Sequence, residues 1–191
     1  MDTLKEKLSL VAILFSMLSI SASPHPIMLI LAYIIHELGH IIFAHITGAK
    51  IKKMRGGVFH LSISYDTNEL SYGKEALVCS GGIIFNLLSS LIIFLINAEN
   101  SDTLSAFFTF NLALALMNLS PVSILDGGGI LKSLLLMKAR EDVAEKICFA
   151  VSFVFAILLW LIAVYMQIVI SANISLFLIS ILLLIQLCFS I

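Results

Sequence analysis

Charged side chains are scarce in this chain, where Asp, Glu, Lys and Arg make up only 12% of 191 residues. Soluble domains carry roughly 25% of these residues. Together with 60% hydrophobic residues and a mean hydropathy of +1.10, this scarcity indicates an integral membrane protein. No polar block is long enough for a separate soluble domain. The formal net charge of −1 argues against nucleic acid as a partner.

Cysteine is also rare, with three residues in the whole chain. Cys79, Cys148 and Cys188 lie far apart within apolar stretches and show no C-x-x-C spacing. We therefore expect buried thiols rather than disulfides or metal ligands.

Six apolar runs predict an all-α membrane protein with about six transmembrane helices. These runs cover residues 8–21, 26–47, 73–96, 103–119, 143–166 and 171–191. The first run resembles a signal peptide, but we expect an uncleaved helix because the chain is multi-spanning. The polar stretch 49–72 predicts a small β hairpin or strand insert between the second and third helices. We expect a single polytopic domain over 1–191, with a core at about 26–137 and accessory helices in 1–25 and 138–191.

One side of the membrane is expected to lack cations altogether. If the six segments span, all 11 Lys and Arg residues fall on the other side. They are Lys5, Lys7, Lys50, Lys52, Lys53, Arg55, Lys74, Lys132, Lys138, Arg140 and Lys146. The positive-inside rule then places both termini in the cytoplasm.

The second apolar run contains ionisable side chains, in the sequence His36-Glu37-Leu38-Gly39-His40. Residues four apart share one face of a helix, so both imidazoles can point toward one metal ion. This H-E-x-x-H spacing is typical of zinc sites in which the glutamate acts on a metal-bound water. Such side chains are costly in a bilayer, which favours a functional role for them.

A second polar feature follows the fourth apolar run. Pro121 ends that helix, and the glycines at 127–129 permit irregular backbone, which a membrane tolerates only when it is buried or lines a wet cavity. Asp126 is therefore the best candidate for a third zinc ligand, and capping of the helix that follows is the alternative. Residues 130–137 are too short to span and predict a re-entrant or interfacial helix.

These motifs closely resemble those of the site-2 protease family of intramembrane zinc metalloproteases. The likeness covers about residues 27–135, and its most specific part is Asn118-Leu119-x-Pro121-x4-Asp126-Gly127. It implies one Zn2+ per chain, bound by His36, His40 and Asp126, with Glu37 as the catalytic base. Four further residues match family motif positions and are expected to support the active site or the substrate: Asn118, Pro121, Asn86 and Gly82. Ile83 departs from the pattern, because the family usually has proline there.

The compact chain is most similar to the bacterial sporulation-type (stage IV sporulation) branch, although that branch often carries a nucleotide-binding CBS domain. The resemblance implies a multi-pass protein of a bacterial cell membrane. It also implies hydrolysis of a peptide bond in a membrane-tethered protein, by Glu-assisted attack of zinc-bound water. The substrate would be a pro-sigma or anti-sigma factor, and membrane proteins would act as regulatory partners. Because a helix hides its carbonyls, the substrate must be extended, and the strand expected at 57–65 could hold it by edge pairing.

The residues alone leave two other functions open. The first is a non-enzymatic metal-binding scaffold or pseudoprotease, which the intact Glu37 argues against because a structural zinc needs no base. The second is a zinc transporter, which the lack of an inverted repeat argues against.

Overall fold

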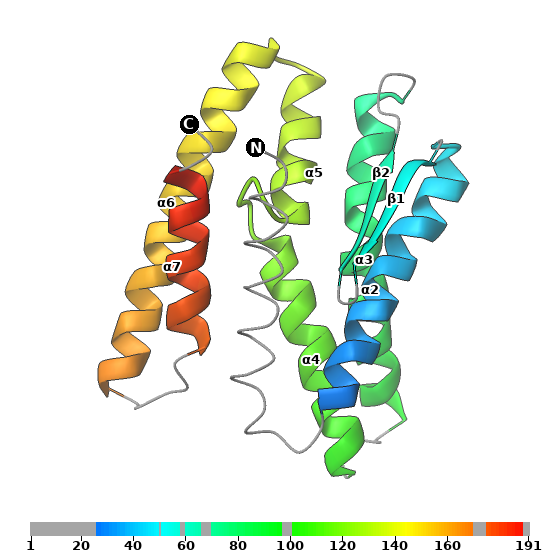
Figure 1. Ribbon diagram of the computed structural model, residues 1–191, viewed down its shortest axis with the longest axis vertical. Helices are drawn as coiled ribbons and strands as arrows, with labels where there is room; N and C mark the ends of the chain where they lie inside the picture. The colour runs from blue at the N-terminus through cyan, green and yellow to red at the C-terminus, as the bar shows by residue number, and fades with distance from the viewer. Residues whose placement is uncertain are drawn as a thin grey trace.

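The computed structural model describes residues 26–49, 51–57, 60–65, 70–96, 101–169 and 175–188. The predicted first helix at 8–21 lies outside these residues. The described elements are α2 (Pro26–Thr47), β1 (Ile51–Gly57), β2 (His60–Tyr65), α3 (Tyr72–Leu95), α4 (Asp102–Leu119), α5 (Asp126–Leu136), α6 (Glu141–Val169) and α7 (Ser175–Cys188) (Figure 1). The protein is therefore predominantly α-helical, as its apolar runs predict.

Four helices in the described part of the chain are long and apolar enough to cross a membrane, namely α2, α3, α4 and α6. The run predicted to span at 171–191 contains the shorter helix α7, of 14 residues. Leu91 on α3 and Leu161 on α6 are each 50% exposed, as expected for helices that face lipid rather than water. Four of the six predicted spans thus correspond to helices of membrane-crossing length.

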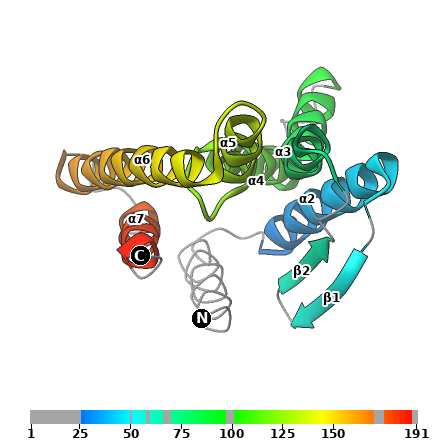
Figure 2. The same ribbon diagram turned by 90° about the horizontal axis from the view of Figure 1, so that it is seen from above.

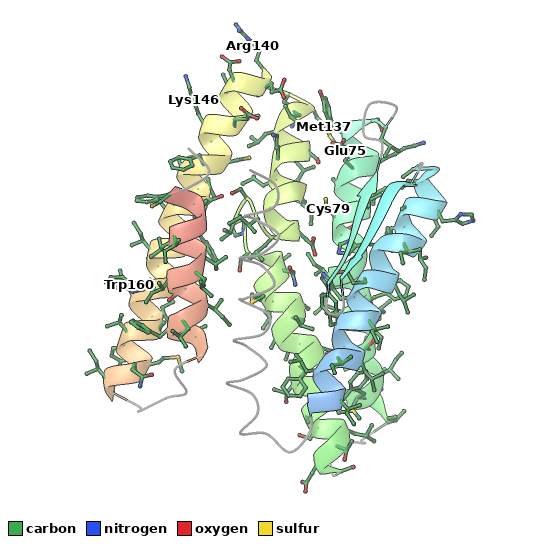
Figure 3. All side chains as sticks on the ribbon, viewed as in Figure 1. Glu75, Cys79, Met137, Arg140, Lys146 and Trp160 are labelled. Carbon is green, nitrogen blue, oxygen red and sulfur yellow. The ribbon has the colours of Figure 1, made fainter. Side chains whose placement is uncertain are left out.

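Helices α2 to α5 form one group, in which α3 contacts each of the others. Helix α3 packs against α2, α4 and α5, whereas α6 packs along α7 and contacts α5 (Figures 1 and 2). Arg140 and Lys146 lie at the end of α6 that meets α5, and Trp160 lies farther along its apolar length (Figure 3).

The close packing of α2 on α3 depends on two glycines. A Cβ on Gly81 would lie only 2.8 Å from the carbonyl carbon of Gly39, so the two backbones touch there. At the neighbouring end of α2, Lys74 Nζ donates to the carbonyl oxygen of Thr47 at 3.0 Å. A cation at a helix C-terminus is favourable because the last carbonyls lack partners within the helix.

Strands β1 and β2 connect α2 to α3 as a two-stranded antiparallel sheet. Ile51 pairs with Tyr65 and Gly57 with His60, with an irregularity between Ile51 and Lys53. The sheet contacts α2 through β2 and lies on the side of α2 away from α3 (Figure 2).

The helical path is interrupted between α4 and α5, as Pro121 predicts, and this non-helical segment is here called the break. Residues 120–125 are non-helical, and α5 begins at Asp126, four residues earlier than the short helix expected at 130–137. Val122 in this break is fully buried against Ala156 of α6 and Leu187 of α7.

The three cysteines are free thiols, and their burial differs from the prediction. Cys148 is buried and Cys79 half-buried, but Cys188 is exposed. The expectation of burial is therefore wrong for Cys188, which is the last residue of α7.

Candidate metal centre

His36 and His40 point toward each other from successive turns of α2. Their rings meet edge to face with centroids 4.8 Å apart, and their Nε2 atoms are 3.2 Å apart. His36 is 5% exposed, and His40 is partly buried. The spacing of four residues therefore places both nitrogens at one point, as the helical geometry requires.

Asp126 reaches the same point from the first residue of α5. Its Oδ2 atom lies 3.0 Å from His36 Nε2 and 3.2 Å from His40 Nε2. Leu125, not Asp126, occupies the N-cap position of α5, and no side-chain capping bond is formed. The carboxylate therefore faces the imidazoles rather than the free N–H groups of its own helix.

The three atoms fit a metal ion such as zinc. Tetrahedral zinc with bonds of about 2.0–2.1 Å sets neighbouring ligand atoms about 3.3 Å apart. The triangle formed by His36 Nε2, His40 Nε2 and Asp126 Oδ2 has sides of 3.0, 3.2 and 3.2 Å. Asp126 Oδ2 is also buried and has no hydrogen-bond donor among the described residues, a costly state that a cation would relieve.

The backbone of α3 fixes the orientation of His40. His40 Nδ1 lies 2.8 Å from the carbonyl oxygen of Val78. A carbonyl can only accept, so Nδ1 carries the proton, and in the neutral tautomer Nε2 would offer its lone pair on the side of Asp126 and His36. This arrangement suits a metal ligand, whose second ring nitrogen usually donates to an oxygen.

Asn86 plays the corresponding part beside His36. Its amide nitrogen lies 3.3 Å from His36 Nδ1, the residue is fully buried, and its Oδ1 has no partner among the described residues. If Nε2 of His36 binds a metal, Nδ1 carries the proton and needs an acceptor. A 180° turn of the Asn86 amide would place Oδ1 there. Oδ1 would then accept from His36 Nδ1–H, so both of these atoms would have a partner.

Gly82 leaves space for the two imidazoles. A Cβ on this residue would lie 2.6 Å from both His36 Cε1 and His40 Nε2, distances that real Cβ atoms do not adopt. Ile83, which replaces the usual proline, is buried within an unbroken α3. The helix therefore brings Gly82 and Asn86 to the metal centre without that proline.

The other predicted site residues lie outside the cluster of ligand atoms. Glu37 lies between the two histidines in the sequence and is half-buried. Asn118 donates to the carbonyl oxygen of Leu114 in its own helix at 3.0 Å, and the carbonyl oxygen of Pro121 accepts from Ser152 Oγ at 3.2 Å. These contacts shape the end of α4 and do not touch the imidazoles.

Two contributors were missed by the sequence reasoning. The carbonyl of Val78 is a backbone group, so no residue pattern could mark it. Ser152 lies on α6, within the segment expected to form accessory helices, and its only signal is one small polar residue in an apolar run.

A cavity of about 590 Å³ lies between α3 and α5. Val78, whose carbonyl orients His40, and Gly129, one turn beyond Asp126, both line it. Glu75 and Cys79, which lie on α3 beside α5 in Figure 3, line it too. The cavity is therefore partly polar and shares Val78 with the surroundings of His40.

Comparisons with known proteins bear on the fold of this chain. Residues 96–162 match the sequence model of Peptidase family M50, a segment that includes Asp126 but not the two histidines. No match was found among curated proteins. Among solved structures, the site-2 protease from Methanocaldococcus jannaschii is similar, with 24% sequence identity and a TM-score of 0.61. The chain has the site-2 protease fold.

The likeness to the site-2 protease structure extends over 94% of this chain and 87% of that one. It therefore includes α6 and α7 as well as the helices that carry the metal centre. The match to the peptidase family covers less than half of the chain, and neither comparison singles out the sporulation-type branch.

Proposed function

We propose that this protein is an intramembrane zinc metalloprotease that hydrolyses a peptide bond in a membrane-tethered protein. The triangle of His36 Nε2, His40 Nε2 and Asp126 Oδ2 carries this proposal, because its sides suit one face of a zinc tetrahedron. The helices around it are apolar enough to cross a membrane, and the fold is that of a site-2 protease.

Three protein ligands leave the fourth tetrahedral position open, as in catalytic rather than structural zinc sites. When bound, zinc would supply an acidified water and a Lewis acid for the scissile carbonyl. His40 would be kept in the ligating tautomer by Val78, and His36 by Asn86.

Glu37 would serve as the general base and then as the general acid. It follows His36 directly, so its side chain leaves the helix about 100° around from that ligand, beside the metal rather than on it. From there it could take a proton from the attacking water and return it to the leaving amine. Its partly buried position is consistent with this role.

The substrate would have to be extended, because a helix hides its carbonyl groups in hydrogen bonds. The sheet of β1 and β2 lies beside α2, the helix that carries both histidines. Within the described residues it has only two strands, so each keeps an outer edge that could pair with an extended peptide.

We further propose that the protein sits in a bacterial cell membrane with six spans and both termini in the cytoplasm. The positive-inside rule supports this orientation, and Arg140 and Lys146 gather at one end of the molecule (Figure 3). A pro-sigma or anti-sigma factor remains our preferred substrate, with membrane proteins as regulatory partners.

The test is cleavage of membrane-tethered candidate substrates by the purified protein in liposomes. Glu37→Gln should keep about one zinc per chain, but its cleavage rate should fall by at least about 100-fold, because a general base typically contributes that much to the rate. Glu145→Gln, a change at an exposed glutamate of α6, is the matched control and should cleave like wild type.

Two results would contradict the proposed protease function. Cleavage that persists in Glu37→Gln would remove the proposed mechanism. Zinc uptake into the same liposomes without any peptide cleavage would support the transporter instead.

A further inference from the structure

We propose that Ser152 of α6 is a positioning residue for the metal centre. Its hydroxyl would hold the break between α4 and α5 in the shape that brings Asp126 to the two imidazoles. The consequence for hydrolysis rests on the proposed function, whereas the consequence for metal binding can be measured separately.

Ser152 forms hydrogen bonds to both sides of the break. Its Oγ accepts from the backbone N–H of Ser123 at 2.9 Å and donates to the carbonyl oxygen of Pro121 at 3.2 Å. The side chain is fully buried. Pro121 is half-buried and Ser123 exposed, and both lie outside the helical hydrogen-bond ladder. The one hydroxyl supplies an acceptor to Ser123 and a donor to Pro121.

Val122, between these two bonded residues, forms a second anchor. It is fully buried and belongs to a cluster with Ala156 of α6 and with Leu183 and Leu187 of α7. The break is therefore held to the α6–α7 pair both by hydrogen bonds and by a packed apolar side chain.

Residues 121–123, which Ser152 and the apolar cluster hold in place, lie just before Asp126 in the chain. The Leu125 N–H donates to the carbonyl oxygen of Val122 at 2.8 Å, and the Leu125 carbonyl accepts from Gly128 N–H at 3.0 Å. A Cβ on Gly128 would lie 2.5 Å from Cα of Ser123, so the first turn of α5 rests on the break. A shift of residues 121–123 must therefore displace the start of α5 and Asp126 Oδ2 with it.

The metal centre is sensitive to such a displacement. Ligand distances in metal sites are held within about 0.2 Å, and outer-shell changes cost about 10–100-fold in metal affinity. The α6–α7 pair thus affects the metal through the break, although none of its residues belongs to the cluster of ligand atoms.

Ser180 offers a matched control. It lies on α7 and is fully buried like Ser152, but among the described residues its hydroxyl donates only to Phe177 of its own helix, at 2.7 Å. Truncation of either serine removes one buried hydroxyl, and only truncation of Ser152 releases the break.

The experiment compares the full-length wild type with Ser152→Ala and Ser180→Ala in detergent. Zinc affinity is measured by competition with a chelator, and the absorption bands of bound Co(II) report the ligand geometry. Ser152→Ala should weaken zinc binding about 10–100-fold and shift the Co(II) bands. Ser180→Ala should stay within about twofold of wild type with the same bands.

Unchanged zinc affinity and Co(II) bands in Ser152→Ala would overturn the positioning role. If that variant does not fold, Ser152→Cys, with its similar shape and weaker hydrogen bonds, takes its place and should lose several-fold in affinity. A cysteine variant with wild-type affinity would overturn the role equally. A wild type that binds no zinc would contradict the proposed function instead.

Discussion

Gly82 and His40 lie so close that no side chain fits between them. A Cβ on Gly82 would stand 2.6 Å from His40 Nε2, the atom that faces Asp126 and His36. The metal centre therefore depends on a residue with no side chain as much as on its ligands.

Gly82→Ala should accordingly destroy the metal centre. The added methyl group must push an imidazole away or separate α2 from α3, and overpacking of this kind costs about 1–3 kcal/mol of folding free energy. We expect the purified variant to lose zinc and to unfold at a lower temperature. Gly73→Ala is the control, because a Cβ there would meet only the flexible end of Met137, at 3.3 Å. Stoichiometric zinc in Gly82→Ala would show that the close approach is unimportant.

Asn86→Ala should weaken zinc binding about 10–100-fold, because His36 Nδ1 would lose the partner that orients its ring. Ser90→Ala is the matched control one turn further along α3. Ser90 is buried and donates to the carbonyl oxygen of Phe108 at 3.3 Å, without contact with either histidine. Its removal should cost about 1 kcal/mol of stability and leave zinc affinity unchanged. Equal zinc affinities for both variants would mean that Asn86 has only a packing role.

Asp126→Asn tests ligation against a helix-terminus effect. Asp126 and Asp102 are each the first residue of a helix, so both carboxylates favour the positive end of the helix dipole. Only Asp126 faces the imidazoles. Asp126→Asn should therefore lower zinc affinity by more than tenfold, whereas Asp102→Asn should leave it unchanged and alter only stability, by less than about 1 kcal/mol. Equal losses in both variants would favour the helix-terminus effect.

The convergence of the two histidines follows from the sequence because it depends on local helix geometry. His36 and His40 need only the helical period to converge, and the apolar runs predict α2, α3, α4 and α6 closely. Asp126 stands out as an acid in an apolar, glycine-rich segment. These features depend on residue type and spacing, which the chain displays directly.

The remaining contributors depend on tertiary contacts that spacing does not encode. The start of α5 at Asp126 was missed because glycines usually weaken a helix, whereas here Gly128 lets the first turn rest on the break. The hydrogen bond of the Asn118 amide to Leu114 within α4 is another contact that residue spacing does not reveal. Ser152 gains its role from a hydroxyl that meets residues 29 and 31 positions away.

The zinc content of the purified protein and its histidine variants tests the account most directly. His36→Ala and His40→Ala remove proposed ligands, and His45→Ala removes an exposed histidine of the same helix. We predict about one zinc per chain in wild type and His45→Ala, and almost none in the other two. Equal zinc contents across all four proteins, or a wild type that takes up no zinc when supplied with it, would contradict the account.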